Sequence, residues 1–326
     1  MMQKTLALCL TLAASPALAD YPETVRDHIL PGYAAFATVT ADLATQAQAS
    51  CAPETLRPAW QAAFDAWMGV AHLQLGPVED QGRALAIAYW PDPKGLGWKQ
   101  QQALLTGDPA NLEPAAFADQ SVAARGLFGL ERLLYPEAPL PSDACPLIRA
   151  TATDLARMAA EVQAGWQGQG GYADAMLTAG AAGNTTFLTG PEVRQALFTQ
   201  LATGLEFLSD QRLGRPMGQP SQPHPERAEA RASGRSLRNV LLSLQAMRGM
   251  VDTLTPDAPK TMAAFDHTIA LAEKLDDPVF AGVNDPSGRL KVEILQQSVQ
   301  HLREVMVDEL AAELDVGIGF NAGDGD

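Results

Sequence analysis

This sequence has no long apolar run, and its most apolar segment lies close to the N-terminus. The apolar segment Thr5–Leu12 has too few residues to cross a lipid bilayer, and no later run approaches the required length. We therefore expect a chain that does not span a membrane. Basic residues are scarce relative to acidic ones, and the formal net charge is -15 at pH 7. Such a chain repels phosphate backbones, so nucleic acid is not an expected partner, although cations could be attracted.

Cysteine is rare, with 3 residues in a chain of 326. Cys9 lies in the N-terminal apolar segment, which leaves Cys51 and Cys145 in the remainder. No C-x-x-C spacing occurs, which argues against thiol redox catalysis and against a cysteine-ligated zinc site. For an exported chain we predict one disulfide between Cys51 and Cys145, worth about 4 kcal/mol because the loop it closes is long. Two free buried thiols are the alternative.

Catalytic sequence motifs are lacking as well. There is no H-E-x-x-H and no G-x-S-x-G, and the 5 histidines are far apart. A zinc or serine hydrolase site would therefore have to be assembled from distant segments. His301 and Glu304 lie one helical turn apart and could share a metal, but such a pair is more typical of a solvated helix face. We interpret His72 as a satisfied or surface histidine.

The N-terminus has the features of an export signal. Lys4 precedes the apolar segment, and Ala17-Leu18-Ala19 supplies the small residues of a cleavage site. We predict a signal peptide over residues 1–19. A lipid anchor is not expected, because Cys9 lies within the apolar segment rather than at the cleavage point. The mature protein is therefore expected in the periplasm or outside the cell.

Apolar residues recur at intervals of three and four along most of the remaining chain, which predicts an all-α fold. No segment alternates long enough to predict a sheet, and only "RALAIAYW" at 83–90 leaves a strand or a helical turn open. The predicted helices, about four in each half, include residues 33–47, 56–71, 127–134, 147–166, 197–208, 237–254, 265–275 and 294–310. Gly-rich "GQGGY" at 168–172 separates the halves, and long loops are expected at 76–118 and 214–226. We predict two packed four-helix bundles, residues 20–168 and 169–326.

The stretch "RGLFGLERLLYPE" at 125–137 places Gly126, Phe128 and Glu131 on one predicted helix. Phe128 and Glu131 are three residues apart and share a helix face. Glu131 lies beside the apolar stripe of that helix, and a buried carboxylate needs a hydrogen-bond donor or a cation. An arginine from another helix and a metal ion are the two candidates.

Two other segments could contribute to a pocket. In "YWPDPKGLGW" at 89–98, Trp90 could form a wall of a binding site or pack as part of a lid over the first bundle. In "SGRSLRN" at 233–239, Arg235 and Arg238 could bind an anion or pair with a buried carboxylate. The sequence leaves both sets of alternatives open.

Stretches along most of the mature chain resemble the imelysin-like family. They are "ILPGYAAFATVTADLATQAQASC", "LRPAWQAAFDAWMGVAHLQLGPV", "YWPDPKG", "GLFGLERLLY", "SGRSLRNVLLSLQAMRGM" and "GFNAGDGD". The resemblance implies an exported protein of two packed four-helix bundles. The family was first described as insulin-cleaving metalloproteases and is linked to iron-regulated uptake systems.

The signature of that family is G-x-H-x-x-E. Gly126 and Glu131 match it, but Phe128 stands at the histidine position. Phenylalanine can neither coordinate a metal nor take a proton. The resemblance therefore implies that metal binding and peptidase activity carry over poorly, and that Glu131 is a remnant or a structural acid.

The leading functional hypothesis is an exported, non-catalytic binding or accessory protein linked to metal acquisition, with iron as the first candidate. Its site would lie between the bundles near Glu131, with Arg235, Trp90 and Asp324 as further residues. A divalent or ferric ion is the candidate cofactor, Glu131 is a weak candidate ligand, and envelope or metal-uptake proteins are the candidate partners. The alternatives are a zinc-type metallopeptidase with Glu131 as its base, and a helical interaction module of the cell envelope.

Overall fold

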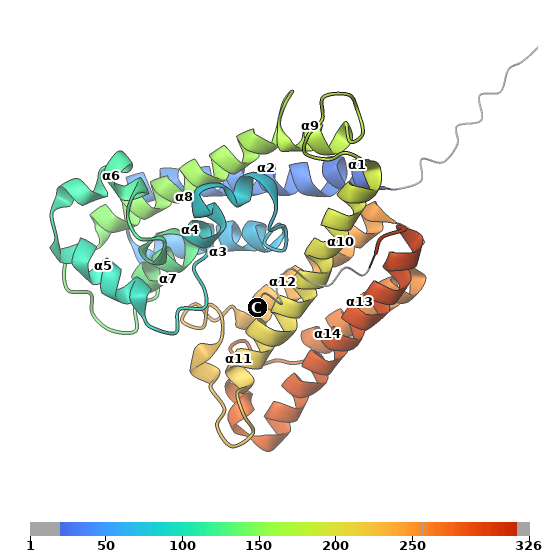
Figure 1. The fold of residues 1–326 in the computed structure, drawn as a ribbon. Coiled ribbons are helices and arrows are strands. Elements are labelled where there is room, and N and C mark those ends of the chain that lie inside the picture. Colours follow the sequence, from blue (N-terminus) through green and yellow to red (C-terminus); the bar gives the residue numbers. More distant parts are fainter. Residues whose placement is uncertain (1–19, 256, 318–326) are drawn as a thin grey trace, which may run out of the picture.

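A computed structural model describes residues 20–255 and 257–317, and these residues form an all-helical fold without β-strands. The longer helices fall into two groups that are inclined to each other (Figure 1). The first group is α2 (Leu30–Ala49), α3 (Pro53–Met68), α7 (Gly126–Leu134) and α8 (Cys145–Trp166). The second group is α10 (Gly190–Phe207), α12 (Ser236–Leu254), α13 (Pro259–Glu273) and α14 (Pro286–Glu313). The predicted helices and the all-α fold are thereby confirmed.

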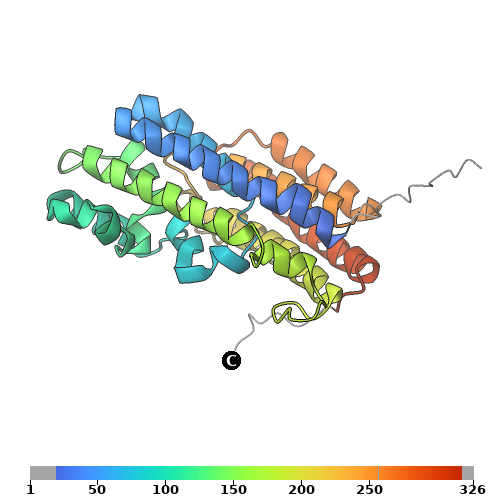
Figure 2. The same ribbon diagram turned by 90° about the horizontal axis from the view of Figure 1, so that it is seen from above.

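The apolar stripes explain why these segments are helical. Each stripe that the sequence shows at spacings of three and four becomes the buried face of its helix. A helix of this length is only marginally stable alone in water, and packing of its apolar face against other helices supplies most of its stability. On α8, the buried residues include Leu147, Thr151, Leu155, Met158, Val162 and Trp166. Helix α2 packs on α8 and α3, as the view from above also shows (Figure 2).

Segment 76–118 differs from the long loop that the sequence predicts. It contains α4 (Arg83–Ile87), α5 (Leu96–Thr106) and α6 (Pro114–Ala118), so the ambiguous stretch at 83–90 starts as a helix. The Asp92 carboxylate accepts hydrogen bonds from the backbone N–H groups of Leu96 and Gly97, both at 2.8 Å, and so caps α5. Few residues of α5 are buried, which is why its apolar stripe is hard to recognise in the sequence.

The beginning of the described chain packs on the second group. Helix α1 (Tyr21–Glu23) and the π-helical turn η1 (Thr24–Ile29) contact α12, and α1 also contacts α10. Asp20 caps α1 and forms an ion pair with Arg194 of α10. One hydrophobic core therefore extends through both groups. The remaining short α-helices are α9 (Tyr172–Leu177) and α11 (Gly214–Met217).

The predicted disulfide is confirmed. Cys51, just before α3, is bonded to Cys145, the first residue of α8, with their Cα atoms 5.3 Å apart. The bond therefore ties two helices of the first group together at one end. Among the described helices, none has both the length and the apolar character needed to cross a bilayer.

Candidate functional site

Helix α7 begins at a close contact that requires glycine. Gly126 has φ +66°, and a Cβ atom added there would lie 2.2 Å from the carbonyl oxygen of Ala86 and 2.3 Å from that of Ile87. Any larger residue would clash with this backbone and adopt an unfavourable conformation. Gly126 therefore lets α7 start directly against α4, and this contact fixes the position of the residues that follow.

Phe128 is part of the core. Its side chain is buried, and its ring lies edge-on to Phe64 of α3, with ring centroids 5.4 Å apart. Such aromatic pairs add to the stabilisation that burial alone provides. Phe128 therefore occupies an apolar niche between α3 and α7.

Glu131 is buried and has a hydrogen-bonding partner that the sequence did not indicate. Its Oε1 atom accepts hydrogen bonds from the backbone N–H of Ser233 at 3.0 Å and from the Ser233 hydroxyl at 2.7 Å. Burial raises the pKa of the Glu131 carboxyl, while these two bonds and the charges of Arg132 and Arg235 act in the opposite direction. The partner is thus a serine rather than the arginine or metal ion considered from the sequence, and the two residues are 102 positions apart.

The residues of this motif do not fit a metal ion. Phe128 has no donor atom, and Oε1 of Glu131 already accepts two hydrogen bonds. Within residues 20–255 and 257–317, no three side chains of His, Cys, Asp and Glu converge as metal ligands would. We therefore derive no chemistry at Glu131 that depends on a bound metal.

Replacing Glu131 by glutamine should make stability less dependent on pH. A raised pKa in the folded state means that the protonated carboxyl favours folding, and that this contribution is lost as the pH rises through the raised pKa. Glutamine cannot ionise but can still accept the bonds from Ser233. Thermal unfolding between about pH 4 and about pH 7 should therefore show Glu131→Gln gaining on the wild type as the pH rises.

Two companion variants make this measurement specific. Glu131→Ala leaves the Ser233 N–H without its acceptor, whereas the hydroxyl can turn to the Ala230 carbonyl at 3.0 Å, and the variant should cost about 1–3 kcal/mol. Glu137→Gln, at a side chain that is 77% exposed, should not change the pH dependence. If the stability difference between Glu131→Gln and the wild type were the same at every pH, the raised pKa would be wrong.

Arg235 is a buried structural cation. It is 1% exposed, its Nε donates to Oδ1 of Asn239 at 2.7 Å, and one Nη donates to Oδ1 of Asp65 at 2.9 Å. The guanidinium carbon lies 4.1 Å from the centre of the Phe64 ring. Arg238 also pairs with Asp65. Of the two roles left open by the sequence, the structure therefore shows pairing with a carboxylate.

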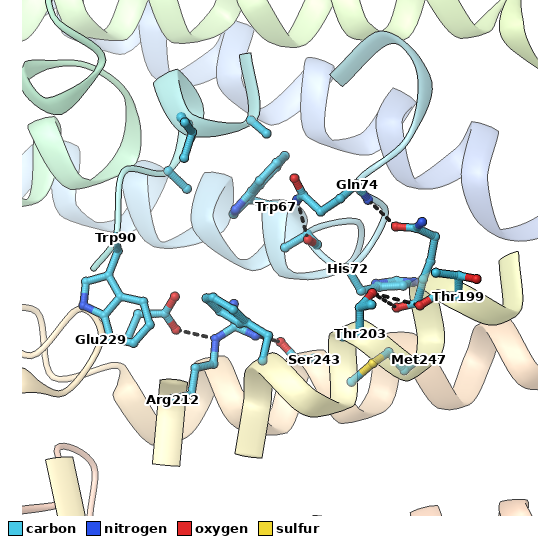
Figure 3. A pocket seen from close by; sticks show the side chains of 17 residues that line it. Trp67, His72, Gln74, Trp90, Thr199, Thr203, Arg212, Glu229, Ser243 and Met247 are labelled. Atoms are coloured by element: carbon cyan, nitrogen blue, oxygen red, sulfur yellow. Dashed lines mark hydrogen bonds and ion pairs between the residues drawn. The ribbon is translucent and has the colours of Figure 1, made fainter. Parts of the chain in front are cut away.

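A cavity of about 510 Å³ lies between the two groups of helices (Figure 3). Its apolar walls include Trp67, Trp90 and Phe207, and the Trp90 and Phe207 rings meet edge to face with centroids 6.0 Å apart. Its polar lining residues include His72, Gln74, Thr199, Gln200, Thr203, Arg212, Glu229 and Ser243. Cavities of this size and mixed character bind small molecules in other proteins.

A buried ion pair forms part of the cavity wall. Nε of Arg212 donates to Oε2 of Glu229 at 2.7 Å, and one Nη of Arg212 donates to the Ser243 hydroxyl at 2.9 Å (Figure 3). The same oxygen of Glu229 accepts a hydrogen bond from the Asn239 side chain at 2.8 Å. Both charged side chains are more than nine-tenths buried. The network extends through Asn239 to Arg235, which connects the cavity wall with Asp65 of α3.

His72 also lines the cavity, and it is not the satisfied or surface residue that the sequence suggests. It is 7% exposed, its Nε2 lies 3.2 Å from Sδ of Met250, and its Nδ1 has no hydrogen-bond partner among the described residues. Burial lowers the pKa of His72 well below its usual value, and the charges of His28 and Arg212 act in the same direction. By contrast, His301 and Glu304 are 73% and 74% exposed on α14, in agreement with a solvated helix face.

The structure brings together only part of the site suggested by the sequence. Trp90 lines the cavity, whereas Glu131 and Arg235 are not among its lining residues, and Asp324 lies outside the described residues. The segment between η7 (Pro225–Arg227) and α12 connects the two regions, because it supplies Glu229 to the cavity and Ser233 to Glu131. Arg212 and Glu229 were missed, since neither belongs to a recognisable motif.

The family model described as Imelysin matches residues 29–306. An imelysin-like protein from Psychrobacter arcticum 273-4 has a similar structure, with a TM-score of 0.73, 18% identity, and coverage of 93% of this chain and 100% of that chain. A putative iron-regulated protein A precursor from Parabacteroides distasonis ATCC 8503 has a TM-score of 0.69 and 14% identity, covering 91% of this chain and 97% of that chain. No curated protein matches the sequence.

Proposed function

The chain belongs to the imelysin family, and on this premise we propose that it is an exported, non-catalytic binding protein connected with the acquisition of iron. Family membership supports the general class, and one structurally similar protein is described as iron-regulated. A disulfide suits an oxidising compartment such as the periplasm. The predicted signal peptide, residues 1–19, lies outside the described residues. Peptidase activity is not part of the proposal.

The observation that carries this proposal is the cavity between the two groups of helices, together with the packed state of the motif residues Phe128 and Glu131. Phe128 packs in the core and supplies no metal ligand, and Oε1 of Glu131 is held by two hydrogen bonds from Ser233, which supports a structural role for this motif. The cavity, at about 510 Å³, is far larger than a bare ion requires. We infer that its ligand is an organic iron chelate, with a flat part against Trp67 and Trp90 and polar groups facing Arg212 and Ser243.

We also propose that the chain is organised as two units, residues 20–168 and 169–326. The two groups of helices support this division, since α2, α3, α7 and α8 lie before the boundary and α10, α12, α13 and α14 lie after it. The cavity then lies at the junction of the two units, a common place for small-molecule sites. Other envelope or metal-uptake proteins are the proposed partners.

Binding of an iron chelate should stabilise the protein measurably. Ferric citrate and a ferric catecholate complex are suitable probes, and a ligand at one hundred times its Kd should add about 2.7 kcal/mol to the free energy of unfolding. Trp90→Leu should weaken binding at least about tenfold, which corresponds to a loss of about 1.4 kcal/mol of binding free energy. The measurement is a thermal unfolding titration together with tryptophan fluorescence.

The control for this experiment is Trp98→Leu, because Trp98 lies beside Arg132 and Tyr135 and does not line the cavity. A peptidase assay with and without a chelator should accompany the titration. Chelator-sensitive peptide cleavage by the purified protein would refute the proposal in favour of a metallopeptidase. If neither ferric citrate nor the ferric catecholate complex binds, the proposed link to iron chelates is wrong.

A further inference from the structure

Four side chains with nitrogen and thioether donors converge where the beginning of the chain meets α12. His28 belongs to η1, His72 follows α3, and Met247 and Met250 are one turn apart on α12. The His28 and His72 rings have centroids 5.5 Å apart, and Nε2 of His72 lies 3.2 Å from Sδ of Met250. A Cβ atom added to Gly204 would be 2.8 Å from Sδ of Met247 and 3.1 Å from Cβ of His72, which places that sulfur beside His72.

The hydrogen bonding of the two histidines is incomplete. Nε2 of His28 and Nδ1 of His72 are buried and have no partner among the described residues. A thioether sulfur accepts hydrogen bonds weakly and donates none, so either neutral tautomer of His72 leaves a nitrogen lone pair without a donor. Buried polar atoms are satisfied in most proteins, and each exception needs an explanation. An ion between Nε2 of His72 and Sδ of Met250 would use the His72 lone pair that faces the sulfur, and Nε2 of His28 is a further nitrogen without a partner among the described residues.

The donor set selects among metals. Thioether sulfur favours cuprous copper, imidazole suits copper well, and carboxylate oxygen suits magnesium, calcium and manganese. The described residues bring no group of three His, Cys, Asp and Glu side chains together, so a hard ion would find few oxygen ligands here. The nearby charge of Arg212 opposes a divalent or trivalent cation more strongly than a monovalent one.

We propose that His28, His72 and Met250 bind a cuprous ion, with Met247 as a fourth donor. His72 and Met247 line the cavity at the end away from Trp90, which gives the ion a route from outside (Figure 3). The site is separate from Glu131 and Phe128. It does not depend on the proposed iron chelate, because Met250 and His28 are not among the residues that line the cavity.

The test is competition for Cu(I) under anaerobic conditions between the full protein and the chromophoric chelator bicinchoninate. The wild type should retain one Cu(I) per chain, and X-ray absorption should show both nitrogen and sulfur scatterers. Met250→Leu conserves volume and should keep the fold, but it should weaken Cu(I) binding at least about tenfold and reduce the sulfur signal. Met306→Leu, at a buried methionine of α14, should leave binding unchanged.

A second variant protects the test against loss of folding. His72→Gln keeps a polar side chain of similar size and should also lose Cu(I) affinity, with circular dichroism checking that the helices remain. Failure of the wild type to hold Cu(I), a coordination shell of nitrogen alone, or unchanged affinity in both variants would each overturn the proposal. Equal affinity for Zn(II) would also overturn it. Met250→Leu should still bind ferric citrate, because Met250 does not line the cavity. The iron proposal and the copper proposal are therefore tested independently.

Discussion

Replacing Glu229 by alanine is expected to lower the free energy of unfolding by about 3–5 kcal/mol. Glu229 and Arg212 are both buried, and the substitution would leave the guanidinium of Arg212 inside the protein without its carboxylate. It would also remove the acceptor for the Asn239 side chain. Removing one partner of a buried ion pair is more costly than never having built the pair, because the remaining charge is desolvated without compensation.

Denaturant unfolding of three variants measures this effect. Glu226→Ala, three positions earlier and with a 60% exposed side chain, should cost less than about 1 kcal/mol and serves as the control. The double variant Arg212→Met/Glu229→Leu removes both charges and should recover most of the loss, although Nδ2 of Asn239 would lose its acceptor and the Ser243 hydroxyl its donor. A cost below about 1 kcal/mol for Glu229→Ala would contradict the burial of this pair.

Removing the disulfide should have an effect of similar size. Cys51 and Cys145 are separated by 94 positions, and a cross-link over a loop of that length restricts the unfolded chain strongly. In the chain-entropy account, the double variant Cys51→Ala/Cys145→Ala should lose about 4 kcal/mol of unfolding free energy. Comparing denaturant unfolding of the oxidised wild type and the double variant gives this difference directly.

A reductant provides the matched control for the disulfide. It should destabilise the wild type by nearly as much as the double substitution and should leave the double variant unaffected. A loss below about 1 kcal/mol would mean that the unfolded chain is already restricted around these positions, or that the cross-link contributes little. Retention of the bound ferric chelate in the double variant would show that the cavity forms without the cross-link.

The helices could be predicted because their signal is local. The spacing of Trp60, Phe64 and Trp67 within α3 shows which face is buried without any knowledge of the neighbouring helix. The disulfide could be predicted for a different reason, since Cys9 lies in the predicted signal peptide and only Cys51 and Cys145 remain to pair. Helix α5 was missed because its cap, Asp92, lies in a Pro- and Gly-rich stretch that reads as a loop.

The candidate site depends on contacts that no local pattern records. Glu131 meets Ser233 over 102 positions, and His72 meets Met250 over 178. The residue type of Arg212 does not tell whether its side chain is buried or exposed to solvent. Only the packing of the helices decides that. The sequence therefore located Glu131 and Trp90 as residues of interest but could not identify what each would touch.

The contact of the first helical turns with α12 has a consequence for biosynthesis. Oγ1 of Thr253 donates a hydrogen bond to Oγ1 of Thr24 across 229 positions, and Asp20 reaches Arg194 on α10. A ribosome delivers Thr24 long before its partner exists, so this seam can close only after most of the polypeptide has been made. The beginning of the described chain therefore finds these partners only after α10 and α12 have been synthesised, so its native packing cannot form on a short nascent segment.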